Sequence, residues 1–111
     1  MKPRVLTVLG ATGTIGVNTL DVVARHPGRF EVFALTGATQ VERMVEQCRL
    51  HRPRIAVMNE PAAADALHAR LRAEGIATEV RAGADALTAV ATAPEVDTVM
   101  AAIVGAAGLP A

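Results

Sequence analysis

The stretch that decides the fold reads Val5-Leu-Thr-Val-Leu-Gly-Ala-Thr-Gly-Thr-Ile-Gly16, an apolar segment that ends directly in glycines. The apolar part predicts a buried strand that delivers the backbone to a tight turn at Gly10. Gly13 lacks a Cβ, so a bulky anion can approach the main chain, and Gly16 allows the following helix to pack closely against the sheet. That helix points its unpaired N–H groups and its positive dipole end at the turn. A diphosphate fits this arrangement, so the stretch predicts a dinucleotide-binding βαβ unit.

The spacing of these glycines is a weak signal by itself, because the chain has 9 glycines among 111 residues. The context strengthens it: the glycines begin where a predicted strand ends, and a segment with helical periodicity follows at once. The alternative is a strand-turn-helix corner that uses glycine only for its backbone freedom. The context favours nucleotide binding over that alternative.

The composition describes one small domain with no bias in charge. The chain is 51% hydrophobic, and its 11 acidic residues balance its 11 basic residues, which gives a formal net charge of zero. This balance gives no reason to expect nucleic acid or an anionic membrane as a partner. The only aromatic side chains, Phe30 and Phe33, do not make a stacking platform for single-stranded bases.

Cysteine content and hydropathy indicate a cytoplasmic protein. Cys48 is the only cysteine, so no intramolecular disulfide is possible, and we expect a packing thiol in a reducing compartment. No apolar run reaches the ~18 residues needed to span a bilayer. The first apolar stretch stops at Gly10, which is too early for a signal peptide. We therefore expect a soluble, cytoplasmic chain.

Short apolar or β-branched segments alternate with longer segments of helical spacing. The predicted strands are Val5–Leu9, Glu31–Leu35, Arg54–Met58, Thr78–Arg81 and Thr98–Ile103. The predicted helices are Ile15–Arg25, Gln40–Leu50, Pro61–Ala73 and Gly83–Thr92. This alternation predicts an α/β fold, a Rossmann-like doubly wound parallel sheet in three αβα layers, that occupies residues 1–111 as one domain. The runs Ile55–Met58 and Val99–Val104 have almost no polar residues, which is typical of central strands.

The second predicted strand ends without the acid that would select NAD. In this fold an Asp or Glu about 20 residues past the last glycine accepts from the ribose 2′-OH. Here the strand ends in Thr36-Gly37-Ala38-Thr39-Gln40, so the acid that would repel a 2′-phosphate is absent, and NADP is favoured. Thr39 and Gln40 are neutral donors, and Arg43 is the nearest cation. The alternative is a polar loop followed by a solvated arginine.

The segment Met100–Leu109 consists mostly of small apolar residues. A strand that runs into such residues lets a flat group approach its C-terminal end, where ligands bind in parallel sheets. The alternative is close packing of a helix on the sheet through Gly105 and Gly108, and the residues alone do not choose between the two.

Three segments together resemble the NADPH-binding domain of the 1-deoxy-D-xylulose 5-phosphate reductoisomerase family. They are Leu9-Gly-Ala-Thr-Gly-Thr-Ile-Gly16 with Thr19-Leu-Asp-Val-Val23, then Ala34-Leu35 leading to Val45-Glu-Gln-Cys48, and finally Ala101-Ala-Ile-Val-Gly-Ala-Ala-Gly-Leu109. The last segment is more specific than the glycine motif, which many dehydrogenases share. The resemblance extends over essentially the whole chain and covers the first quarter to third of such an enzyme.

The resemblance implies an enzyme that converts 1-deoxy-D-xylulose 5-phosphate, a phosphosugar, into 2-C-methyl-D-erythritol 4-phosphate in the non-mevalonate isoprenoid pathway. It implies NADPH, a divalent metal (Mg²⁺, Mn²⁺ or Co²⁺) and a homodimer. The residues that match the pyrophosphate turn are Thr12, Gly13, Thr14 and Ile15. The 2′-phosphate loop matches Gly37–Gln40, and the nicotinamide half of the cofactor is expected near Ala102, Ile103 and Gly105.

The sequence departs from the family at two places. Ala38, Thr39 and Gln40 stand where the family often has Gly-Lys-Asn, so Gln40 can still donate, but the strength of the NADPH preference stays open. The chain also stops at Ala111, before the family's Ala-Asn-Lys-Glu segment, its metal ligands and its substrate-phosphate site. We therefore expect cofactor binding and no catalysis from this chain.

Two other functional classes stay open from the residues. One is the cofactor domain of another NADP-dependent reductase, such as a semialdehyde dehydrogenase or an extended short-chain dehydrogenase. The other is a non-enzymatic nucleotide-binding module. The other reductases do not account for the segment Ala101–Leu109, and an exposed fifth strand followed by an apolar loop argues against the non-enzymatic module. The histidines at positions 26, 51 and 68 stand alone near predicted helix ends, so we expect no metal site in this chain.

Overall fold

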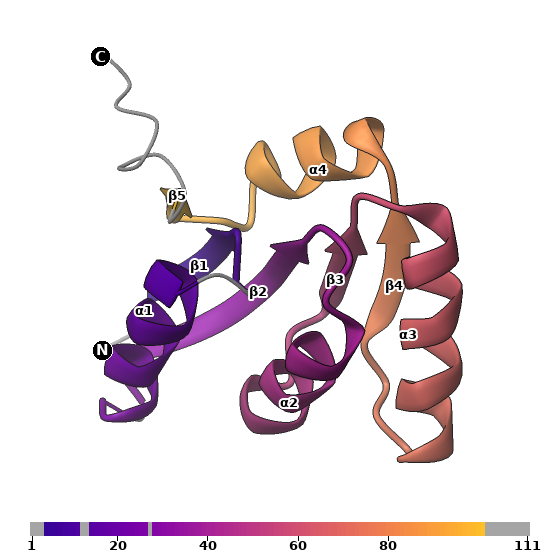
Figure 1. Ribbon diagram of the computed structural model, residues 1–111. Helices are drawn as coiled ribbons and strands as arrows, with labels where there is room; N and C mark the ends of the chain where they lie inside the picture. The colour runs from indigo at the N-terminus through magenta and orange to yellow at the C-terminus, as the bar shows by residue number, and fades with distance from the viewer. Residues whose placement is uncertain (1–3, 12–13, 27, 102–111) are drawn as a thin grey trace.

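The computed structural model describes residues 4–11, 14–26 and 28–101, and for residues 14, 15, 100 and 101 it describes the backbone only. Strands and helices alternate along this part of the chain (Figure 1). The strands are β1 (Arg4–Leu9), β2 (Phe30–Gly37), β3 (Ile55–Met58), β4 (Glu79–Ala82) and β5 (Thr98–Ala101). The helices are α1 (Thr14–Ala24), α2 (Val41–His51), α3 (Pro61–Ala73) and α4 (Ala84–Ala91). Each predicted element is confirmed, with ends that differ by at most a few residues.

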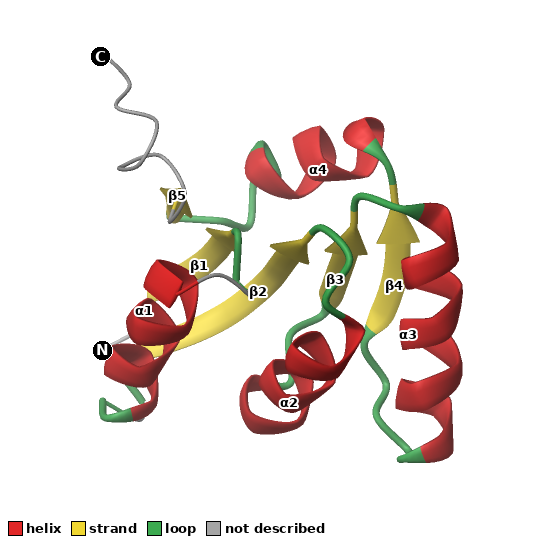
Figure 2. Ribbon diagram, viewed as in Figure 1, coloured by secondary structure: helices red, strands yellow, loops and turns green. Residues whose placement is uncertain are grey.

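The five described strands form one parallel sheet in the order β4-β3-β2-β1-β5. Figure 2 shows the heads of β1 to β4 at the same end of the sheet. From β1 to β4 each new strand is added on the same side, and the chain then returns to place β5 on the free side of β1. This order confirms the Rossmann-like α/β fold.

Two apolar cores, one on each face of the sheet, make up the three layers. On one face, side chains of α1, α2 and α3 pack against the sheet in a cluster that includes Leu20, Met44 and Leu67. On the other face, Ala86 and Val90 of α4 pack in a second cluster with residues of β2 and β3. Helices therefore cover both faces of the sheet, which is why β3 carries four consecutive buried residues.

The prediction of a central strand is confirmed for β3, whereas most of the run at 99–104 lies outside the residues whose side chains are described. Within the part of the chain that the structure describes, β5 pairs only with β1 and lies at an edge of the sheet. Val99 is 38% exposed. An apolar run indicates surface that a strand can bury, and it does not reveal which neighbours are present to cover that surface.

Cys48 lies on the buried side of α2 and is fully inaccessible, as predicted for a packing thiol. Burial raises the pKa of this thiol to about 12. No helix formed by the described residues has the length and apolar character that a membrane span requires.

Cys48 should make the free energy of unfolding decrease as the pH rises above about 9. The unfolded thiol loses its proton near its ordinary pKa of 9.0, whereas the folded thiol keeps its proton up to a pKa of about 12. Across this window the native state binds more protons than the unfolded state, so stability should decrease by about 1.4 kcal/mol per pH unit. Urea unfolding across the window measures this slope.

The control for that measurement is Cys48→Ala. Few other groups titrate in the same window, since the chain has no tyrosine and Lys2 is its only lysine. The alanine variant should lose most of the alkaline slope, although it starts from a lower stability because of the cavity. An unchanged slope in this variant would contradict the assignment to Cys48.

Candidate functional site

The glycine turn lies at the point where the order of the strands reverses. β1 has β2 on one side and β5 on the other, and the helices before and after this point cover opposite faces. Leu9, the last residue of β1, is paired with Ala101, the last residue of β5. The carboxyl ends of the two strands therefore lie side by side. In open parallel sheets, the crevice at such a switch point is where ligands bind.

Thr36, at the end of β2, fixes the conformation of the turn. The backbone N–H of Gly10 donates to Thr36 Oγ1 (3.0 Å), and the N–H of Ala11 donates to the carbonyl of Thr36 (2.7 Å). Thr36 is buried, and Gly10 has a φ of +73°, a conformation that favours glycine. The tight turn predicted at Gly10 is confirmed, and its amide groups are tied to the neighbouring strand.

Gly16 is required by the turn itself. A Cβ at this position would lie 2.1 Å from the carbonyl oxygen of Gly10 and 2.8 Å from the Cα of Ala11. Backbone atoms cannot yield by that amount, so no side chain fits. The sequence predicted that Gly16 allows close packing against the sheet, and the structure shows that the close partner is the backbone of the turn. The first turns of α1 therefore lie directly on the glycine turn.

Several predicted site residues fall outside what the structure describes. Thr12 and Gly13 lie between the described ranges, and Ala102, Ile103 and Gly105 follow the last described residue. Thr14 and Ile15 are the first residues of α1, and their backbone is described. Because α1 begins at Thr14, its unpaired N–H groups follow directly on the glycine turn, as predicted.

The predicted 2′-phosphate loop lies next to this turn, because it follows Thr36 directly. Gly37 ends β2 and accepts a hydrogen bond from the N–H of Asn59 (2.9 Å). Ala38, Thr39 and Gln40 are exposed. Gln40 is the N-cap of α2, and its side chain makes no capping hydrogen bond. An exposed helix N-terminus without a side-chain cap can accept an anion.

Sequence analysis missed two residues near the carboxyl ends of the strands. Thr36 falls in the segment that ends the predicted second strand, and no local pattern marks it as the partner of the glycine turn. Glu42 was not considered, although it is the acidic residue in the first turn of α2. Arg43, which was considered, is exposed in the same turn.

The acidic and histidine side chains of the described residues do not gather into a metal site. No group of three or more His, Cys, Asp or Glu residues within the described ranges could hold a metal ion. Asp97 pairs instead with β1: its Oδ2 accepts from the N–H of Val5 (2.9 Å), and its own N–H donates to the carbonyl of Val5 (2.9 Å). Asp21 forms a surface ion pair with Arg25 (3.0 Å). Asp97 and Asp21 therefore have structural partners.

Replacing Thr36 with valine should loosen the glycine turn. The variant keeps the shape of the side chain and removes the oxygen that accepts from the N–H of Gly10, so a half-buried donor loses its partner. We expect the free energy of unfolding to decrease by about 1 to 3 kcal/mol in urea titrations. Thr92→Val is the control, because Thr92 is exposed and its hydroxyl donates only to the carbonyl of Thr88 within its own helix. Equal effects of the two variants would contradict the role of Thr36.

Comparison with known proteins gives one consistent result. Residues 6–111 match the family model of 1-deoxy-D-xylulose 5-phosphate reductoisomerase. The reductoisomerase of Nitrosospira multiformis is 58% identical over 106 residues, which cover 96% of this chain and 27% of that protein. The reductoisomerase of Aromatoleum aromaticum is 62% identical over 104 residues, which cover 94% of this chain and 26% of that protein. The chain thus spans about a quarter of the length of these curated relatives.

Solved structures agree with the sequence relatives. The Zymomonas mobilis reductoisomerase in complex with NADPH superposes with a TM-score of 0.77 at 38% identity, covering 84% of this chain and 24% of that chain. A DOX-P reductoisomerase in complex with NADPH, fosmidomycin and magnesium gives a TM-score of 0.82 at 31% identity, covering 86% and 23% of the two chains. These matches do not favour another reductase family or a non-enzymatic module. The chain belongs to the 1-deoxy-D-xylulose 5-phosphate reductoisomerase family.

Proposed function

We propose that residues 1–111 form the NADPH-binding domain of a reductoisomerase that converts 1-deoxy-D-xylulose 5-phosphate into 2-C-methyl-D-erythritol 4-phosphate. The observation that carries this proposal is the glycine turn at the switch point of the sheet, tied by Thr36 to the strand that leads into the Gly37–Gln40 loop. Relatives solved with NADPH support the choice of cofactor.

The described residues fit a dinucleotide. The turn has no room for a Cβ at Gly16, its backbone is held by Thr36, and the N-terminus of α1 follows it. We assign the diphosphate to this cradle, with contacts from Gly10, Thr12, Gly13, Thr14, Ile15 and Gly16. A diphosphate there would accept hydrogen bonds from backbone N–H groups at the positive end of α1.

The 2′-phosphate and the nicotinamide occupy two further parts of the proposed site. We assign the 2′-phosphate to Gly37, Ala38, Thr39 and Gln40, where the uncapped N-terminus of α2 is exposed and Arg43 adds positive charge. We assign the nicotinamide half to Ala102, Ile103 and Gly105, which follow the end of β5 beside Leu9. When bound, NADPH supplies the hydride for the reduction, and the role of this chain is to bind and orient it.

The remaining parts of the activity belong to the rest of a full-length family member. The described residues offer no group that fits a divalent metal, so we assign the ligands of Mg²⁺, Mn²⁺ or Co²⁺ and the phosphosugar site elsewhere. We also propose a homodimer in the cytoplasm, with neither nucleic acid nor a membrane as partner.

A side-by-side titration of the folded chain with NADPH and NADH tests this function. We expect saturable binding of both nucleotides, with NADPH tighter. Gly13→Val should abolish binding while circular dichroism stays unchanged, because the side chain fills the space of the diphosphate. A folded chain that binds neither nucleotide would contradict the proposal. Unchanged affinity in folded Gly13→Val would contradict the assignment of the turn.

Gln40→Lys should tighten NADPH more than NADH, because a cation at the N-cap of α2 attracts a 2′-phosphate that NADH lacks. We expect the ratio of the two dissociation constants to change by about fivefold. Ala69→Lys adds the same charge at an exposed position in the later half of α3 and should leave the ratio unchanged. Equal tightening of both nucleotides by Gln40→Lys would place the phosphate elsewhere.

A further inference from the structure

An acidic side chain stands beside the proposed 2′-phosphate loop. Glu42 is in the first turn of α2, two residues after Gln40. A carboxylate in a first turn is favourable for the helix, because it faces the positive end of the dipole. The same carboxylate opposes a second anion at that helix end. Binding of a 2′-phosphate at this loop therefore requires that the negative charge of Glu42 be offset by a cation.

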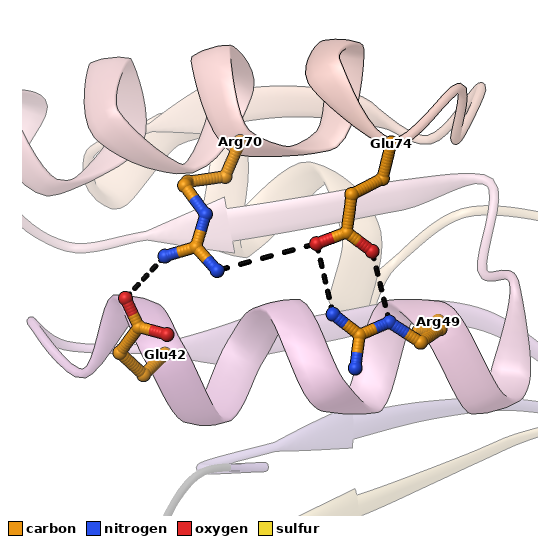
Figure 3. A network of polar contacts seen from close by, with 4 residues as sticks. All are labelled: Glu42, Arg49, Arg70 and Glu74. Atoms are coloured by element: carbon orange, nitrogen blue, oxygen red, sulfur yellow. Dashed lines mark hydrogen bonds and ion pairs between the residues drawn. The ribbon is translucent and has the colours of Figure 1, made fainter.

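Arg70 of α3 meets this acid. Its guanidinium donates to Glu42 Oε2, and Figure 3 shows the two groups facing each other across the gap between α2 and α3. The side chain of Glu42 is 78% exposed and that of Arg70 is 41% exposed, so the carboxylate of Glu42 is open to solvent. Arg70 and Glu42 thus form an ion pair between α3 and the first turn of α2.

Two further residues extend this ion pair into a network. Glu74 lies 4.0 Å from the other end of the Arg70 guanidinium. Arg49 of α2 donates to both oxygens of Glu74, with N–O distances of 2.8 Å each. Figure 3 shows the resulting chain of four side chains, which bridges the two helices along one side. A bidentate arginine–carboxylate pair has a defined geometry, so Arg49 fixes the orientation of the Glu74 carboxylate that faces Arg70.

The stabilising effect of this network on the fold is small. Exposed ion pairs contribute about 0 to 1 kcal/mol each, because solvent screens them and long side chains lose freedom. Their effect on a neighbouring anion is different, since it depends on the local charge near the first turn of α2. We therefore expect the network to affect the affinity for an anion at the first turn of α2 more than the free energy of unfolding.

We infer that Arg70 is a positioning residue for cofactor specificity: by pairing with Glu42 it holds and neutralises the carboxylate beside the 2′-phosphate loop, and so favours NADPH over NADH. This inference rests on the proposed function, because it requires a 2′-phosphate at the Gly37–Gln40 loop. It adds a residue from α3 to a site whose other residues come from the ends of β1, β2 and β5 and from the first turns of α1 and α2.

The test measures the ratio of the dissociation constants for NADPH and NADH in four folded chains: wild type, Arg70→Gln, Glu42→Gln and the double variant. Arg70→Gln should weaken NADPH relative to NADH by about threefold, because Glu42 is released beside the phosphate. The double variant should return to the wild-type ratio or a higher one, since the carboxylate is gone. The effect of Arg70→Gln should also shrink at high salt.

Arg72→Gln is the matched control, because it removes the same charge two residues away on the same helix. Its ratio should equal that of the wild type. The inference is overturned if Arg70→Gln leaves the ratio unchanged, if Arg72→Gln lowers it equally, or if the double variant stays as low as Arg70→Gln alone. A wild-type chain that binds no NADPH would instead overturn the proposed function, on which this inference rests.

Discussion

The proposed cofactor site depends on two hydrogen bonds from one turn to one threonine. The N–H groups of Gly10 and Ala11 are directed to the side chain and the carbonyl of Thr36, so the end of β1 is tied to the end of β2. This tie holds the turn in the left-handed conformation at Gly10 and brings α1 against it at Gly16. It also fixes where the 37–40 loop begins. These two hydrogen bonds therefore link the two loops that we assign to the cofactor.

The two ends of the parallel sheet differ in role: we assign ligand binding to the carboxyl ends of the strands, and the polar groups at the amino ends join strands to one another. At the carboxyl ends of the strands, the glycine turn lies at the switch point, and the exposed N-terminus of α2 follows β2. At the amino ends, Asp97 closes a pair of hydrogen bonds with Val5 before β5 starts. Polar groups at the amino ends are thus used to join strands. The polar groups of the carboxyl edge include several that a ligand can use.

The sequence was sufficient for the local elements and for the glycine turn. Strands and helices follow from nearest-neighbour patterns, such as the stripe of Ala64, Leu67 and Leu71 that α3 buries. The family could be predicted because the glycine segment and the segment at 101–109 occur together. The pairing of β5 with β1 among the described strands could not be predicted, since apolar composition does not reveal which strand pairs with which.

The tie at Thr36 and the Arg70–Glu42 pair were also beyond the sequence. Each joins residues at least 25 positions apart, and no periodicity records such a contact. Gly16 was predicted for the right reason and with the wrong partner, because the Cβ that it lacks would meet the turn instead of the sheet. Local patterns therefore locate the backbone cradle, whereas the side chains that hold it or adjust its charge appear only when distant elements come together.

The most direct test of the central claim is to map the amide signals of the ¹⁵N-labelled chain during titration with NADPH. The claim is that the cofactor lies along the carboxyl edge, from the glycine turn to the first turn of α2. The largest chemical-shift changes should fall on Gly10, Ala11, Gly16 and the residues from Gly37 to Arg43. The amides around Arg52 and Asp97, at the opposite edge of the sheet, should change little. The largest changes at that opposite edge would contradict the account.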